Sequence, residues 1–223
     1  MSRLRVHNVT VSLDGFMAGP DQSLDHPLGV GGGALHEWVF ATRTGYRMLG
    51  LDGGSDGVDE DYAAQGEVGI GATIMGRHMF GPVRGPWHTP TWSESDQPWN
   101  GWWGADPPFH HPVFVLTHHP RPSVEMAGGT TFYFVTGGIR DALDQAGAAA
   151  GDLDVRLGGG AATIAEYLRA GLVDYLHLVI APVLLGSGER LLDGGVADGY
   201  TCSRMVGSTD VTHVELVRSA DRS

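Results

Sequence analysis

The sequence predicts an α/β fold, with a mostly parallel central sheet, helices on both of its faces and an antiparallel hairpin at the C-terminus. Short β-branched runs alternate with helix-forming segments through the middle of the chain, as in parallel strands joined by helices. Residues 200–206 and 211–217 are strand-like and separated by a short polar stretch, which predicts the closing hairpin. No repeat or linker divides the chain, so residues 1–223 are expected to form one domain.

The individual elements follow from the spacing of apolar residues and from turn signals. An alternating segment that ends at Asp14-Gly15 predicts the first strand, and Leu35, Trp38 and Val39 share one side of the first helix. Strands are predicted at residues 6–13, 70–75, 113–117, 131–135, 155–157, 175–182, 200–206 and 211–217. Helices are predicted at residues 34–49, 59–67, 139–150 and 161–172, and a further helix or turn begins at residues 76–79.

The composition favours a globular protein that acts on a small molecule in the cytoplasm. The formal net charge of -12 makes nucleic acids and anionic membranes poor partners. Cys202 is the single cysteine, which excludes an internal disulfide framework and fits a reducing compartment. The N-terminal segment has no apolar core of a secretory signal, and the longest apolar stretch is too short to span a bilayer.

Three consecutive glycines, Gly158 to Gly160, lie between a predicted strand and a predicted helix. A strand that enters such a turn before a helix N-terminus leaves backbone N–H groups free to bind an anion. The alternative is a tight packing turn without a ligand. The turn is not a Walker A loop, and it is not a complete GxGxxG motif because Thr163 stands in place of the third glycine.

A second glycine-rich segment, from Gly29 to Ala34, does match the pattern GxGxxA. The residues before it do not form a predicted strand, and the dinucleotide fingerprint has meaning only between a strand and a helix. We therefore interpret this segment as a loop.

Four segments resemble the dihydrofolate-reductase-like superfamily, most closely the reductase domain of bacterial riboflavin biosynthesis and its stand-alone relatives. They are SLDGFMAGP (residues 12–20), IMGRHMF (74–80), FVLTHHPR (114–121) and the segment RLGGGAATIAEYLRAGLVDYLHLVIAPVLLGSGERLL (156–192). The resemblance implies a three-layer dihydrofolate-reductase-like fold. No deaminase signature (HxE with CxxC) is present, so the chain resembles the reductase domain alone.

The resemblance implies that NADPH lies across the carboxyl edge of the sheet. It assigns Gly158, Gly159, Gly160, Ala161, Ala162 and Thr163 to the pyrophosphate and nicotinamide side, with a cis peptide between Gly158 and Gly159. It assigns Gly76, Arg77, His78 and Met79 to the adenosine half, Thr117 and His118 to the adenine ribose, and Met17 and Ala18 to the nicotinamide. Arg77 is the natural partner of a 2′-phosphate, because its guanidinium is always charged and can donate in pairs. Met79 departs from the family, which often has Thr there.

Two carboxylates are candidates for the catalytic acid. The resemblance places Asp14 beside the substrate, although an Asp-Gly pair is also a common turn signal. Folate reductases carry an acid early in the first helix, where this chain has Leu35 or His36, and Glu37 is the nearest acid. Glu37 is either a pocket acid or a solvated helix residue.

The expected activity is a NADPH-dependent reduction of a C=N or C=O bond in a planar heterocycle such as a pterin, a pyrimidine or a flavin-like ring. The resemblance also implies a homodimer. The alternative is a nucleotide- or flavin-binding protein of the same fold without turnover, in which a flavin or deazaflavin occupies the same cleft.

Five of the six tryptophans, Trp87, Trp92, Trp99, Trp102 and Trp103, fall in an insertion at about residues 82–110. So much aromatic surface in a loop indicates that the loop covers something. The alternatives are a lid over a flat substrate, a subunit interface or a small satellite core.

Two histidine pairs, His110-His111 and His118-His119, invite a metal hypothesis. Adjacent residues of a strand point to opposite faces, so each pair would offer one ligand. Neither an HExxH nor a CxxC motif is present, and no metal site is predicted.

Overall fold

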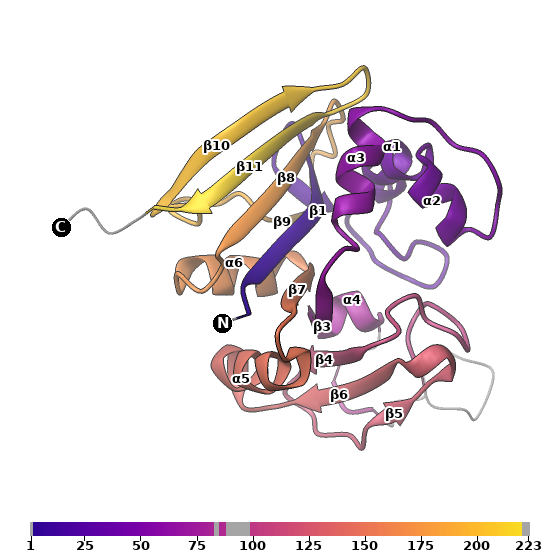
Figure 1. The fold of residues 1–223 in the computed structure, drawn as a ribbon, viewed down its shortest axis with the longest axis vertical. Coiled ribbons are helices and arrows are strands. Elements are labelled where there is room, and N and C mark those ends of the chain that lie inside the picture. Colours follow the sequence, from indigo (N-terminus) through magenta and orange to yellow (C-terminus); the bar gives the residue numbers. More distant parts are fainter. Residues whose placement is uncertain (1, 83–84, 88–98, 220–223) are drawn as a thin grey trace.

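The computed structural model describes residues 2–82, 85–87 and 99–219. Its central sheet is mostly parallel, as predicted, and carries an antiparallel hairpin at one edge (Figure 1). The strands follow the order β10-β11-β8-β1-β7-β3-β4-β6-β5. The parallel strands are β1 (Leu4–Ser12), β3 (Ile70–Gly76), β4 (Pro112–Leu116), β6 (Thr131–Val135), β7 (Asp154–Gly159) and β8 (Tyr175–Ala181). The antiparallel ones are β5 (Val124–Glu125), β10 (Tyr200–Gly207) and β11 (Thr212–Arg218).

One face of the sheet is covered by α5 (Gly138–Ala150) and α6 (Ala161–Arg169). Ile164, Tyr167 and Leu168 of α6 are buried in the main core, together with alanines of α5. These positions recur at helical spacing, which is why the apolar stripe predicted the helix correctly.

The opposite face is covered by short helical segments from the first third of the chain. They are η1 (Gly32–His36), α1 (Glu37–Phe40), α2 (Arg43–Met48) and α3 (Val58–Gln65). Leu35 and Trp38 are buried there against Val179 and Ala181 of β8. Helices on both faces complete the three-layer fold that the sequence predicted.

The single helix predicted at residues 34–49 is wrong, because the structure divides this segment into η1, α1 and α2. Thr42 begins α2 as an N-cap, and its hydroxyl accepts a hydrogen bond from the backbone N–H of Gly45 at 3.0 Å. A Cβ at Gly45 would overlap the carbonyl oxygen of Val39. The cap and this close approach turn the chain where apolar spacing alone suggested continuity.

Two very short strands form a ribbon that the sequence analysis did not predict. They are β2 (Phe16–Ala18) and β9 (Glu189–Arg190), which pair antiparallel outside the main sheet. Segments of two or three residues are too short to show a period. Equally short elements, β5 and η2 (Ala127–Gly129), were missed for the same reason.

The glycine-rich segment near residue 30 packs its backbone against Gly19, the residue that follows β2. A Cβ at Gly29 would overlap the carbonyl oxygen of Gly19, and the chain then enters η1 at Gly32. The loop prediction therefore holds only as far as Gly31. Residues 19–28, which lead into the segment, contain no strand, in agreement with its rejection as a dinucleotide fingerprint.

The tryptophan-rich insertion builds a satellite core on the face opposite α5. Trp87, Trp99 and Trp103 pack with Phe80 and Phe132. Phe80 lies in the single-turn helix α4 (Arg77–Phe80) that follows β3. Trp92 lies outside the described residues. In the part of the chain that the structure describes, no helix is long and apolar enough to cross a membrane.

Candidate functional site

A cleft of about 1090 Å³ lies at the carboxyl ends of β3, β4, β6 and β7. Strands β3 and β7 are neighbours in the sheet, and each ends at a turn that opens into the cleft. All cofactor-binding residues predicted from the sequence line it: Met17, Ala18, Gly76, Arg77, His78, Met79, Thr117, His118, Gly158, Gly159, Gly160, Ala161, Ala162 and Thr163. The structure thus brings four distant segments of the chain to one cavity.

The glycine turn joins β7 directly to α6. The cis peptide lies between Gly159 and Gly160, so the expected position between Gly158 and Gly159 is wrong by one residue. Strand β7 continues through Gly159, two residues beyond the predicted end of this strand at residue 157. Gly160 is the N-cap of α6, and no side-chain cap hydrogen bond forms there among the residues that the structure describes. The first backbone N–H groups of α6 therefore face the cleft without a side-chain partner.

Met17 and Met79 lie against the glycine turn. A Cβ at Gly159 would be 3.0 Å from the sulfur of Met79 and 3.3 Å from the terminal methyl of Met17. At Gly160, by contrast, an added Cβ would meet nothing within 4 Å. The methionines thus support the turn while its last glycine stays open to the cleft.

Arg77 is fixed at the other end of the cleft by three groups. Its guanidinium carbon lies 3.2 Å from the centroid of the Trp87 ring. Its Nη1 donates to the hydroxyl of Thr117 at 3.1 Å, and its Nη2 donates to the carbonyl of Gly85 at 3.2 Å. A guanidinium stacked and hydrogen-bonded in this way loses little entropy when it binds a ligand.

Asp14 lies outside the described lining of the cleft and holds a turn together. Its carboxylate accepts hydrogen bonds from the hydroxyl of Ser12 at 2.5 Å and from the backbone N–H groups of Leu185 at 3.2 Å and Gly186 at 2.7 Å. The Ser12 hydrogen bond, with those from the backbone, lowers the pKa of Asp14 to about 2. A carboxyl group with so low a pKa is ionised near neutral pH and is a poor proton donor.

Glu37 also lies outside the described lining of the cleft, with an exposed side chain at the start of α1. The preceding residue, His36, lines the cleft instead. Its Nδ1 lies 3.4 Å from the carbonyl of Gly32, and burial lowers the pKa of the imidazole. Neither of the two predicted catalytic residues is therefore among the residues that line the cleft, and η1 turns His36 rather than Glu37 toward the cavity.

Several lining residues were not singled out from the sequence. They include Gln22, Glu166 and Glu189. Trp102 and Trp103 of the insertion, which the sequence did single out, also line the cleft. Gln22 donates to the backbone carbonyl of His78 at 3.1 Å, which joins the loop after β2 to α4. The tryptophan-rich insertion thus contributes to a wall of the cleft as well as to a satellite core.

The histidine pairs flank β4 rather than lie within it. His118 and His119 follow the strand and line the cleft, whereas His110 and His111 precede it and line a different cavity. The alternation rule for strands therefore does not apply to either pair. Among the described residues, no three His, Cys, Asp or Glu side chains are grouped as metal ligands would be.

Comparisons with solved structures support the same fold. A putative riboflavin biosynthesis protein from Shewanella sp. PV-4 is 19% identical with a TM-score of 0.57, over 99% of this chain and 100% of that chain. The dihydrofolate reductase from Enterococcus faecalis, complexed with NADP(H) and RAB-propyl, is 12% identical with a TM-score of 0.51, over 98% of this chain and 97% of that chain.

A third structure is a diaminohydroxyphosphoribosylaminopyrimidine deaminase/5-amino-6-(5-phosphoribosylamino)uracil reductase from Thermotoga maritima. It is 11% identical with a TM-score of 0.51, and the match covers 97% of this chain but only 56% of that chain. No curated protein sequence matches this chain. The family model of the RibD C-terminal domain matches residues 6–219. The chain therefore belongs to the RibD C-terminal domain family.

Proposed function

We propose that this protein is a NADPH-dependent reductase. The reaction is the transfer of a hydride to a C=N or C=O bond of a planar heterocycle such as a pterin, a pyrimidine or a flavin-like ring. One observation supports the proposal above all: the residues assigned to the cofactor all line one cleft at the carboxyl edge of the sheet. The family and the reductases among the structural neighbours favour the same class of reaction.

The glycine turn and the first turn of α6 fit a pyrophosphate. The helix has nine residues and no side-chain cap, so its first N–H groups and its dipole are available to an anion. Gly160 leaves the space above it open, and a side chain there would fill the approach. This is the part of the cleft in which we place the pyrophosphate.

Arg77 fits the 2′-phosphate that distinguishes NADPH from NADH. It lines the cleft beside Thr117 and His118, which we assign to the adenosine ribose. The stack on Trp87 presents a planar guanidinium whose orientation is already set. A charge-assisted contact to a phosphate is stronger than a neutral hydrogen bond.

We assign the proton in this reaction to solvent rather than to Asp14 or Glu37. Asp14 is ionised and already accepts three hydrogen bonds, and Glu37 is exposed and does not line the cleft. The expected acid corresponds to position 35 or 36 of this chain. His36 is the titratable residue there, and its side chain lines the cleft. Because burial lowers its pKa, we expect a neutral imidazole that orients the substrate by a hydrogen bond.

A nucleotide- or flavin-binding protein without turnover is the second candidate. It is favoured by the position of both predicted acids outside the cleft lining. A bound flavin or deazaflavin would absorb at about 370–450 nm in freshly purified protein, because the isoalloxazine-type ring brings its own spectrum. NADPH binding without such absorbance would favour the reductase.

We also propose a homodimer. Strand β10 forms one edge of the sheet, most of its residues are exposed, and Met205 on it is 68% exposed. An exposed edge strand is a surface on which another chain can pair. Light scattering coupled to size-exclusion chromatography tests this proposal through the molar mass.

Calorimetric titration of the purified protein with NADPH, and separately with NADH, tests the proposed function. We expect saturable binding of NADPH in the micromolar range and weaker binding of NADH. Turnover with candidate heterocycles is then measured as the loss of absorbance at about 340 nm, near the absorbance maximum of the reduced nicotinamide, as NADPH is oxidised. Failure of both nucleotides to bind would overturn the assignment of the glycine turn.

A further inference from the structure

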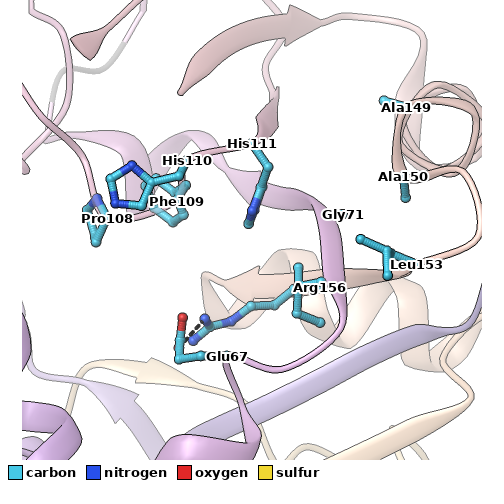
Figure 2. Close-up of a pocket in the computed structure, with 11 residues that line it drawn as sticks. Glu67, Gly71, Pro108, Phe109, His110, His111, Ala149, Ala150, Leu153 and Arg156 are labelled. Carbon is cyan, nitrogen blue, oxygen red and sulfur yellow. Dashed lines mark hydrogen bonds and ion pairs between the residues drawn. The ribbon is translucent and has the colours of Figure 1, made fainter. Parts of the chain in front are cut away.

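A second cavity, of about 520 Å³, lies at the amino ends of the parallel strands, opposite to the cleft at their carboxyl ends. Figure 2 shows the residues that line it. It is formed where β3 and β7 begin, beside the C-terminal end of α5 and the residues that precede β4. Its wall includes Glu67, Ile70, Phe109, His111, Leu153 and Arg156. No residue that we assign to the proposed reaction lines this cavity.

The two cavities are well separated. Strand β3 runs from Ile70, which lines the second cavity, to Gly76, which lines the cleft. At about 3.3 Å per residue, the six steps between them span roughly 20 Å. A molecule in the second cavity would therefore not touch one in the cleft.

Arg156 provides a positive charge with unused donors in this cavity. Its side chain is 21% exposed, and its Nη1 donates to Oε1 of Glu67 at 2.6 Å. Glu67 is its only hydrogen-bond partner among the described residues, although a guanidinium carries five donors. Glu67 follows the end of α3, and its side chain is 39% exposed. The carboxylate can therefore rotate away from Arg156 into solvent.

His111 contributes a neutral polar group. Its Nε2 lies 2.8 Å from the hydroxyl of Thr73, and Figure 2 shows its ring pointing toward the Arg156–Glu67 pair. Burial, followed by the charge of Arg156, lowers the pKa of His111 to about 4. The ring is therefore uncharged near neutral pH. When the Thr73 hydroxyl donates to Nε2, the ring proton lies on Nδ1, which is then a donor.

Apart from His110, the rest of the wall is apolar, and part of it is held in place by close packing. Ile70, Phe109 and Leu153 contribute aliphatic and aromatic surface. A Cβ at Gly71 would lie 2.7 Å from the carbonyl oxygen of Ala150, so the end of α5 packs directly on β3. The cavity thus combines one charged donor with a preformed apolar surface, as small-molecule sites generally do.

We propose that this cavity is a second binding site, for a small monocarboxylate with an apolar or aromatic body. The ligand carboxylate replaces Glu67 on the guanidinium of Arg156 and accepts a further hydrogen bond from His111. The body of the ligand packs against Ile70, Leu153 and Phe109. One guanidinium beside an uncharged imidazole balances a single negative charge, which favours a carboxylate over a doubly charged phosphate.

Benzoate is the probe, and backbone amide NMR of the full chain is the measurement. We expect saturable shifts of the Gly71 and Leu153 amides, without matching shifts at Gly158 to Gly160. Benzamide, which has the same shape without the charge, is expected to bind at least tenfold more weakly. Shifts confined to the glycine turn, or equal binding of benzamide, would overturn the proposal.

Two substitutions are expected to change the affinity for benzoate in opposite directions. Glu67→Gln removes the competing carboxylate, so benzoate should bind several-fold more tightly, whereas Arg156→Gln should weaken binding at least tenfold. Asp193→Asn is the matched control for the change in charge, because it removes an exposed carboxylate that pairs with Arg169 at 3.7 Å elsewhere.

Weaker binding by Glu67→Gln would overturn the displacement of Glu67 and indicate a ligand that donates to it. Unchanged binding by a folded Arg156→Gln variant would exclude the site. Because Glu67 is at the surface, its variant keeps the test decisive even if Arg156→Gln does not fold. Absence of saturable binding by the natural chain at millimolar benzoate would also overturn the proposal.

Discussion

Gly76 and Thr163 meet where β3 ends and α6 begins, and a Cβ at position 76 would overlap the hydroxyl oxygen of Thr163. The contact holds the two halves of the proposed cofactor site against each other, since Gly76 leads into α4 and Thr163 lies in the first turn of α6. Glycine is required here by close approach, because Gly76 has an ordinary extended backbone conformation.

Gly76→Ala is therefore expected to destabilise the fold and weaken NADPH binding. Overpacking of this kind costs roughly 1–3 kcal/mol. Thermal unfolding measures the loss. In the double variant with Thr163→Ala the overlapping oxygen is gone, and the nearest remaining atom would be the Thr163 Cβ at 3.3 Å, so stability should partly return. A Gly76→Ala variant as stable as the natural chain would contradict the close approach.

Arg77→Ala is expected to abolish the preference for NADPH over NADH. Loss of a charge-assisted contact to a phosphate corresponds to about 1.5–3 kcal/mol, or roughly 10- to 150-fold in the dissociation constant of NADPH. Binding of NADH should change little, and calorimetry of both nucleotides measures the ratio. Arg169→Ala removes the same charge from the far end of α6, where Arg169 pairs with Asp193, and should leave both affinities unchanged.

Asp14→Asn separates a structural from a catalytic role. Its carboxylate joins the turn after β1 to Leu185 and Gly186. We expect a lower melting temperature, because the amide cannot accept all three hydrogen bonds equally well, with kcat on any identified substrate close to the natural value. A fall in kcat of a hundredfold or more in a folded variant would restore Asp14 as a catalytic residue.

Acid should destabilise the protein through histidines that are buried uncharged. Burial, followed by neighbouring positive charge, lowers the pKa of His7 to about 3. Burial and then His213 lower the pKa of His177 to about 2. His177 lies between the Asn8 side chain at 3.0 Å and His213 at 3.0 Å, and Tyr62 stacks on its ring.

The direction follows from where the protons bind. Below the ordinary value of 6.5 the unfolded chain protonates these histidines and the folded chain does not, so stability falls as the pH falls from 6.5 toward 3. At pH 5 each histidine lowers the free energy of unfolding by about 2 kcal/mol relative to neutral pH, since each pH unit below 6.5 corresponds to about 1.4 kcal/mol. Urea unfolding at pH 7 and pH 5 measures the difference.

His177→Gln should reduce the number of protons that the chain takes up on unfolding in acid by about one, because glutamine does not titrate. His26→Gln is the control, since His26 is exposed in a loop and its replacement should leave the dependence unchanged. An unaltered pH dependence in a folded His177→Gln variant would show that His177 does not contribute.

Much of the fold was predictable because it depends on local sequence. The strand at residues 131–135 was predicted with its observed bounds, since a short run of apolar and aromatic residues lies between turn signals. The buried positions of α6 follow its apolar stripe. The segment at residues 34–49 was not predictable in this way, because the cap at Thr42 and the packing of Gly45 outweigh its apolar spacing.

The family resemblance supplied the residues assigned to the cofactor, and all of them line one cleft. Most belong to contiguous motifs at the ends of parallel strands, and such ends meet at one edge of the sheet. The two acids predicted to be catalytic, Asp14 and Glu37, do not line this cleft. A shift of one position around η1 decides whether His36 or Glu37 faces the cleft, and helical spacing alone does not resolve it.

The sequence by itself determined the α/β class, the order of the main strands and helices along the chain, and the glycine turn before α6. Only the tertiary structure decided what the polar side chains do. Asp14 is fixed by backbone groups about 170 residues away, Arg77 by Trp87, and Arg156 by Glu67 from a different part of the chain. Periodicity and turn signals act over a few residues, whereas the pKa and the free donors of a side chain depend on neighbours that folding brings together.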